Sequence, residues 1–184
     1  MSAPPQHLLT AEEFAALPLG EMRYELVRGE IVTMPPAFGS HGKPAMRLGA
    51  YLTTFVLTHK LGETYAAETG FLIARDPDTV RAPDVAFIQA SRLTPDTDAN
   101  TWIPVMPDLV ADVVSSGDRP AEIAEKVRMW LDAGVLLVWV AFPGARTIEV
   151  HRLGQPVRTL RDGETLAGED VVPGFALAVS DVFG

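Results

Sequence analysis

The chain has 184 residues, 47% of them hydrophobic, which suits one domain over residues 1–184 that removes roughly 70% of its unfolded surface from water. Because the chain contains no cysteine, disulfides and thiolate metal sites are excluded, and any metal must be held by oxygen or imidazole. The formal net charge of −9 opposes binding to nucleic acid through a broad basic surface, although a bound divalent cation can reverse the potential at a small site.

The chain also carries no signal for export or membrane insertion. Its first residues lack both the positively charged leader and the apolar core of a secretory signal. The longest apolar run, Val135–Phe142, is far shorter than the ~20 residues that span a bilayer. We therefore expect a soluble, cytoplasmic protein with no membrane partner.

The N-terminal part predicts a short helix followed by a hairpin. Thr10 and Glu13 have the spacing of a capping box, which marks the start of the helix. Two β-like runs then flank Arg28-Gly29, so that Arg23–Met34 is typical of a hairpin. This hairpin carries Glu25 in its first strand.

The next part predicts a loop, a helix and two strands. Ala37–Lys43 contains Gly, Ser and His and is typical of a loop, and from Pro44 apolar residues recur at helical spacing until near Gly62. The two strands are expected on either side of the turn-forming Asp76-Pro77-Asp78, at Tyr65–Ile73 and Val80–Ile88. The segment Gln89–Pro107 lacks periodicity and predicts a long surface connection.

The second half predicts a strand, a helix and a strand buried on both faces. In the strand Leu109–Val114, alternation places Asp112 on the same face as branched apolar side chains. Pro120 suits the first position of a helix through Ala133, and Lys126 lies on the edge of the apolar stripe of this helix. The later segments predict three strands and a short apolar tail, at Val135–Val140, Thr147–Leu153, Pro156–Leu160 and Leu166–Phe183.

Two aspartates stand out because they lie inside β-branched and aromatic runs. A carboxylate at such a position needs a partner, so Asp84 and Asp112 are candidate site residues. Each has a structural alternative: Asp84 as the cap of a strand end, and Asp112 as a buried hydrogen-bonding group. For Lys126 the alternative is an (i, i+4) ion pair with Glu122 on the helix surface.

Three further residues could complete such a site. Glu25 is a third carboxylate, with an exposed hairpin position as its structural alternative. Glu68 is a spare carboxylate in a strand that could substitute for Glu25. His41 could contact a phosphate or support a ligand, although a lone loop histidine more often does neither.

Several motifs follow one another along nearly the whole chain: Leu9–Phe14, Tyr24–Glu30, His41 before a helix, Arg81–Phe87, Pro107–Ser115, Glu125-Lys126-Val127, Ala133-Gly134-Val135 with Trp139, and Pro173-Gly174-Phe175. Their order and spacing are more specific than any one motif. Together they resemble the Uma-two family of restriction-endonuclease-like proteins.

This resemblance implies the PD-(D/E)XK nuclease fold, a mixed central sheet flanked by helices, in an α/β protein with an N-terminal helix and hairpin. It implies Asp84, Asp112 and Glu25 as ligands of Mg²⁺ or Mn²⁺ and Lys126 as the catalytic lysine. The lysine is moved from the strand to the following helix, because Val114 stands where the standard motif carries lysine. The chain departs from the family in having aspartate, one methylene shorter than the usual glutamate, at Asp112.

Two functions follow from these residues and this resemblance. The first is a Mg²⁺-dependent endonuclease that hydrolyses phosphodiester bonds, with DNA as the expected substrate and a homodimer as the expected assembly, since two scissions need two sites. The second is a weakly active or inactive nuclease-fold module that binds a partner or regulates, which the charge of −9 and the aspartate at position 112 motivate. No glycine-rich phosphate loop, zinc-protease helix or serine elbow competes with these two functions.

Overall fold

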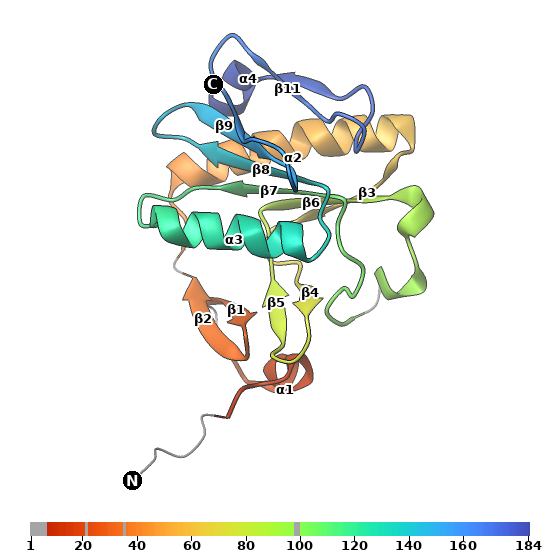
Figure 1. The fold of residues 1–184 in the computed structure, drawn as a ribbon, viewed down its shortest axis with the longest axis vertical. Helices are drawn as coiled ribbons and strands as arrows, with labels where there is room; N and C mark the ends of the chain where they lie inside the picture. The colour runs from red at the N-terminus through yellow and green to blue at the C-terminus, as the bar shows by residue number, and fades with distance from the viewer. Residues whose placement is uncertain (1–6, 21, 35, 98–99) are drawn as a thin grey trace.

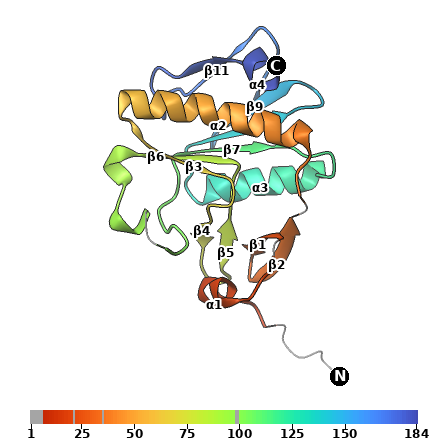
Figure 2. The ribbon, with the colours of Figure 1, turned by 180° about the vertical axis from the view of Figure 1, so that it is seen from behind.

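The protein is described here by a computed structural model, which describes residues 7–20, 22–34, 36–97 and 100–184. Two sheets dominate it, one of six strands and one of four, and helix α3 (Pro120–Asp132) lies between them in both views (Figures 1 and 2). A third sheet pairs two short strands near the C-terminal end, β11 (Thr165–Ala167) and β12 (Ala176–Ala178).

The six-stranded sheet has the order β10-β9-β8-β7-β6-β3. Its central pair, β7 and β8, is parallel and is joined by α3, whereas all other pairs are antiparallel. A parallel pair requires such a crossover, because the chain must return to the same end of the sheet. The strands are β3 (Gly62–Ala66), β6 (Val85–Gln89), β7 (Leu109–Val113), β8 (Leu137–Phe142), β9 (Thr147–His151) and β10 (Arg158–Leu160).

Helices cover both faces of this sheet, so its strands are apolar on both sides. Helices α2 (Gly39–His59) and α4 (Val179–Phe183) pack on one face and α3 on the other. Strand β7 shows the alternation that the sequence predicts: Ala111 contributes to the α2 core and Val110 to the α3 core. Asp112 therefore faces the layer that contains α3.

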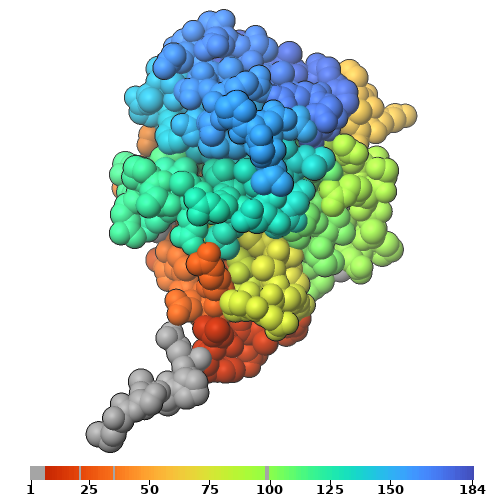
Figure 3. Space-filling model, viewed as in Figure 1, coloured from red at the N-terminus to blue at the C-terminus, as the bar shows by residue number. Residues whose placement is uncertain are grey.

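The four-stranded sheet has the order β2-β1-β5-β4 and is entirely antiparallel. Its strands are β1 (Arg23–Val27), β2 (Glu30–Met34), β4 (Phe71–Ala74) and β5 (Thr79–Arg81). Helix α1 (Ala11–Ala16) closes one face with Phe14 and begins with the predicted capping box of Thr10 and Glu13. In the space-filling view the surface around α3 lies between this sheet and the C-terminal residues (Figure 3).

Several predicted elements are confirmed. The hairpin turns at Arg28-Gly29, α3 begins at Pro120 and is capped at Ala133, and the buried strand follows Gly134. The long connection before β7 holds two single turns of 3₁₀-helix, Ala90–Arg92 and Pro95–Thr97, and an isolated bridge from Ile103 to Phe71. No helix in the described ranges is long and apolar enough to cross a membrane.

Two segments that the sequence predicts as single strands are each divided between two sheets, so these two predictions are wrong. The expected strand Tyr65–Ile73 is broken after β3 by a turn in which Glu68 adopts φ 78°, and the chain then enters the other sheet as β4. The expected strand Val80–Ile88 is likewise split into β5 and β6 around Pro83. Proline cannot donate to a strand ladder, so the chain changes sheets there and Asp84 falls immediately before β6.

The predicted loop before α2 is also wrong. Helix α2 begins at Gly39, so that Pro44 lies inside the helix instead of at its first position. The sequence pattern is misleading because glycine, serine and proline have low propensities inside a helix. Tertiary contacts of this first turn, described below, override that local preference.

Candidate functional site

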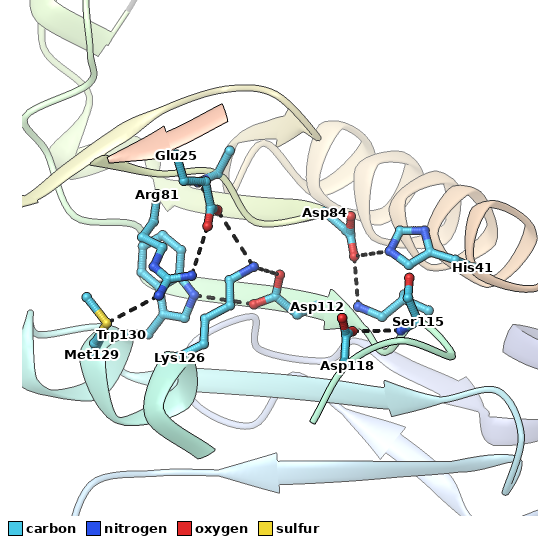
Figure 4. Close-up of polar contacts among 12 residues, drawn as sticks. Glu25, His41, Arg81, Asp84, Asp112, Ser115, Asp118, Lys126, Met129 and Trp130 are labelled. Atoms are coloured by element: carbon cyan, nitrogen blue, oxygen red, sulfur yellow. Dashed lines mark hydrogen bonds and ion pairs between the residues drawn. The ribbon is translucent and has the colours of Figure 1, made fainter. Parts of the chain in front are cut away.

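An ion pair between Asp112 and Lys126 forms the centre of the site. Asp112 lies near the end of β7, and Nζ of Lys126 on α3 lies 2.7 Å from its Oδ1. Trp130 lies one helical turn further and donates from Nε1 to Oδ2 of Asp112 at 3.3 Å. The α3 layer therefore supplies donors to both oxygens of this carboxylate (Figure 4).

Each partner of this ion pair favours the charged form of the other. Burial raises the pKa of Asp112; the nearby charges of Asp84 and Glu25 add to that effect, and the Lys126 ammonium opposes it without cancelling it. Burial alone would lower the pKa of Lys126, but the charges of Asp112 and Glu25 outweigh it, so this pKa is raised. Lys126 therefore remains a cation and is suited to hydrogen-bond donation and charge stabilisation.

Asp84 lies beside Asp112 at the same end of the sheet. Val85 pairs with Ala111 in the antiparallel ladder, so continuing this register by one residue sets Asp84 opposite Asp112. Oδ2 of Asp84 accepts a hydrogen bond from the backbone N–H of Val113 at 2.8 Å and lies 3.1 Å from Nε2 of His41, with which it forms an ion pair when the ring is protonated. The register thus confirms that the two aspartates come from neighbouring strands.

The pair of His41 and Asp84 is nearly buried, with 12% of the His41 side chain and 7% of the Asp84 side chain exposed. Burial acts to raise the pKa of Asp84, but the hydrogen bond and charge of His41 and the Val113 N–H together lower it. The hydrogen bond to Asp84 raises the pKa of His41 against the opposing effect of burial. Asp84 is therefore held as an anion.

Glu25 connects the four-stranded sheet to this centre. It is buried in β1, where Oε2 accepts from Arg81 at 2.8 Å and Oε1 accepts from the backbone N–H of Ala82 at 3.0 Å. Oε1 also lies 3.9 Å from Nζ of Lys126. The Arg81 guanidinium extends the network to Sδ of Met129 on α3, at 3.5 Å. Glu25 is thus a junction between the two sheets and α3.

The donor chemistry of Asp84 and Asp112 fits a hard divalent cation. Mg²⁺ takes oxygen ligands, keeps several waters and is commonly bound by one or two carboxylates, which this pair supplies. Across residues 7–20, 22–34, 36–97 and 100–184, no three or more His, Asp or Glu residues form a group that could hold a metal ion. A cation here would therefore rest on two carboxylates, water and a bound phosphate, or would require Glu25 to exchange its partners.

The structure brings together the four residues that the sequence singled out, Glu25, Asp84, Asp112 and Lys126 (Figure 4). The surface alternative for Lys126 is not formed, since Glu122 pairs with Arg119 instead. Glu68 does not join them: its side chain is 72% exposed and lies 3.9 Å from Arg23. His41 does join them, through Asp84.

Two residues of the network were not predicted from the sequence. Arg81 is the first residue of the Arg81–Phe87 motif, which by itself indicates no role for the arginine, and the structure shows that it binds Glu25. Trp130 lies on the apolar stripe of α3, a position that predicts core packing, yet its ring nitrogen contacts Asp112. An apolar stripe does not reveal where the polar edge of an indole will lie.

A mixed sheet with a parallel central pair, helices on both faces and acids at adjacent strand ends defines a restriction-endonuclease-like fold. A solved structure supports this class: a crystal structure described as "a putative nuclease" from Anabaena variabilis ATCC 29413 is similar with a TM-score of 0.81. The two chains share 20% sequence identity over 95% of this chain and 97% of the other.

The family is given by a sequence comparison. The model of the Uma2 (Uma-two) family, described as "Putative restriction endonuclease", matches residues 11–180. The chain therefore belongs to the Uma2 family. No curated protein matches it.

Proposed function

We propose that this protein is a metal-dependent endonuclease that hydrolyses phosphodiester bonds of nucleic acid, with DNA as its substrate. The observation that carries this proposal is the meeting of Asp84 and Asp112 at adjacent strand ends beside the charged Lys126. Family membership supports nuclease chemistry, because the family is described as "Putative restriction endonuclease". We also propose a homodimer, because two scissions need two sites.

In this proposal Asp84 and Asp112 hold Mg²⁺ or Mn²⁺ through carboxylate oxygens. The bound ion would polarise a phosphoryl oxygen and lower the pKa of a water. Lys126 would donate hydrogen bonds to the attacking water and offset the charge that develops on the phosphate. The raised pKa of Lys126 supports this assignment, because the ammonium remains protonated and does not act as a general base.

The part played by Glu25 is narrower than that of the two aspartates. Both of its oxygens accept hydrogen bonds from protein donors, and one lies 3.9 Å from Lys126. These contacts support a role in which Glu25 holds the cationic side chains in place. Its participation as a third metal ligand stays a prediction.

The proposed activity is tested with supercoiled plasmid DNA, which reports a single nick at any sequence, and with a structured RNA in parallel. Wild-type protein with Mn²⁺ or Mg²⁺ is expected to convert the plasmid to open circles, whereas chelator, Asp112→Asn and Lys126→Met abolish the conversion. A matched change at an exposed lysine on α2, Lys43→Met, is expected to retain it. Cleavage that survives Lys126→Met would contradict the proposed roles.

A second candidate function is a nuclease-fold module without catalysis. It is favoured by the ion pair that engages Lys126 with Asp112 and by the net charge of −9, which opposes adhesion to nucleic acid. Under this function the wild-type chain does not cleave either substrate with either ion. Binding of cation by the wild type, followed by cleavage that requires Lys126, would exclude it.

A further inference from the structure

The first turn of α2 reaches across to the acid at the beginning of β6. His41 is the third residue of α2, and its Nε2 lies 3.1 Å from Oδ2 of Asp84. Helix α2 packs on the face of the sheet opposite α3, so His41 approaches Asp84 from the side away from Lys126. The two carboxylates therefore contact side chains from different layers. Asp112 contacts α3, whereas Asp84 contacts α2 and the β7 backbone (Figure 4).

Both donors to Asp84 converge on the same oxygen. The Val113 N–H and His41 Nε2 contact Oδ2, and within the described residues no hydrogen bond is made to Oδ1. Two donors from different directions prevent rotation of the carboxylate about its Cβ–Cγ bond. Oδ1 is therefore the oxygen that remains for a ligand.

The start of α2 costs local stability that this contact helps to offset. Gly39, Ser40 and Gly42 are poor helix formers, and Pro44 within the helix cannot donate a backbone hydrogen bond. The helix still begins at Gly39 and places His41 in a nearly buried position against Asp84. If Asp84 only capped the end of a strand, the Val113 N–H would suffice as its donor. The helix begins on residues with low helix propensity and still brings His41 to Asp84, which points to a role for His41 in the site.

We propose that His41 is a positioning residue that sets Asp84 for cation binding by fixing Oδ2 and leaving Oδ1 to the ion. This inference rests on the proposed function, because it assumes that Asp84 is a ligand. Groups that orient a metal ligand without touching the ion typically change metal affinity by about 10–100-fold when they are removed. His41 is expected to have an effect of this size on the affinity for Mn²⁺.

The test measures the Mn²⁺ dissociation constant by isothermal titration calorimetry, a readout that does not depend on activity or on an unknown substrate. His41→Leu keeps the bulk of the side chain and removes the donor, and we expect it to weaken Mn²⁺ binding by about 10–100-fold. His41→Gln places an amide N–H close to the position of Nε2, and we expect an affinity near that of wild type. His41→Asn keeps polarity but is too short to place its N–H there, so we expect it to resemble His41→Leu.

A control uses the other end of the same helix. His59 stacks on Phe55 at 4.0 Å between ring centroids, and His59→Leu should leave Mn²⁺ affinity unchanged. Thermal unfolding in chelator establishes that each variant is folded, and His41→Asn replaces His41→Leu if the latter is not. Rescue by glutamine but not by asparagine separates a positioned donor from simple packing.

The outcomes separate this inference from the proposed function. If wild type binds Mn²⁺ and the leucine and asparagine variants bind it equally well, His41 does not position Asp84 and only the inference fails. The same conclusion follows if glutamine does not restore the affinity. If wild type binds no Mn²⁺, the proposed metal-dependent function fails and the inference fails with it.

Discussion

Nζ of Lys126 lies 2.7 Å from Oδ1 of Asp112, although the two residues belong to different layers and are separated by 14 positions in the chain. The contact joins the end of β7 to the middle of α3, the helix that follows it. Neither group is well solvated: 20% of the lysine side chain and 15% of the aspartate side chain are exposed. Without a divalent cation, Lys126 is the main counterion of Asp112.

Loss of this counterion is expected to destabilise the fold. Lys126→Met leaves Asp112 without its principal cation, and breaking a buried ion pair from one side costs about 3–5 kcal/mol. We expect the free energy of unfolding in urea, measured with chelator, to fall by about 3 kcal/mol, the lower end of that range. The exposed control Lys43→Met should change it by about 0.5 kcal/mol or less.

The double variant Lys126→Met with Asp112→Leu removes both charges. We expect it to be more stable than Lys126→Met alone, because no uncompensated carboxylate remains buried. A double variant that loses as much stability as the sum of the two single variants would show that the pair is not coupled.

Divalent cation is expected to stabilise the wild type through Asp84. At Mn²⁺ concentrations about tenfold above the dissociation constant, mass action adds roughly 1.4 kcal/mol, which raises the Tm by about 3–6 °C. Asp84→Asn should remove this shift, because the amide is a weaker ligand and lacks the negative charge. Asp96→Asn, in an exposed 3₁₀ turn, should keep the shift. An equal shift in the Asp84 variant would remove Asp84 from the metal site.

The stability of the cation-free protein is expected to depend on pH through His41. Its pKa is raised chiefly by the hydrogen bond to Asp84, against burial; the charge of Asp118 adds to the rise and that of Arg23 opposes it. A raised histidine pKa contributes stability below the unfolded value of about 6.5, and this contribution is lost as the pH rises through the folded pKa. The Tm of wild type relative to His41→Gln should therefore fall as the pH rises from about 6.5 through the folded pKa of His41. A Tm difference that does not change over this range would contradict the assignment.

The lowered pKa of Asp84 has the opposite sign. Its ionised form is favoured in the folded state, so this contribution is present above the unfolded pKa of about 3.9 and is lost as the pH falls through the lower folded value. Wild type should accordingly lose more stability than Asp84→Asn when a chelated sample is acidified below about pH 4. Equal losses would show that Asp84 ionisation does not stabilise the fold.

Glu25 and Arg81 form another buried ion pair, with 4% and 13% of their side chains exposed. Glu25→Gln leaves the Arg81 guanidinium without its carboxylate and weakens the electrostatic support of Lys126. We expect a loss of about 3 kcal/mol in the free energy of unfolding, measured in urea with chelator. Asp162→Asn is the matched control, because the exposed pair of Asp162 and Arg146 should contribute under about 1 kcal/mol. Equal effects would show that burial does not distinguish the two pairs.

Elements whose signals are local could be predicted from the sequence alone. The capping box of α1, the proline that begins α3 and the period-two alternation of β7 depend on neighbours in the chain, and each is confirmed. From alternation alone, Asp112 could be placed on an apolar face, where a carboxylate requires a partner. The order and spacing of the family motifs then grouped Asp84, Asp112 and Lys126 as one site.

Contacts between distant segments set where α2 begins, where two predicted strands are split between sheets, and which donors reach each acid. Local propensity disfavours a helix over Gly39–Lys43, and the contact of His41 with Asp84 lies in the turn that overrides this preference. The pattern of Glu25 likewise fits an exposed hairpin residue, yet Arg81 and Ala82 bury it. Contacts between distant segments determine these features, and hydrophobic periodicity carries no information about them.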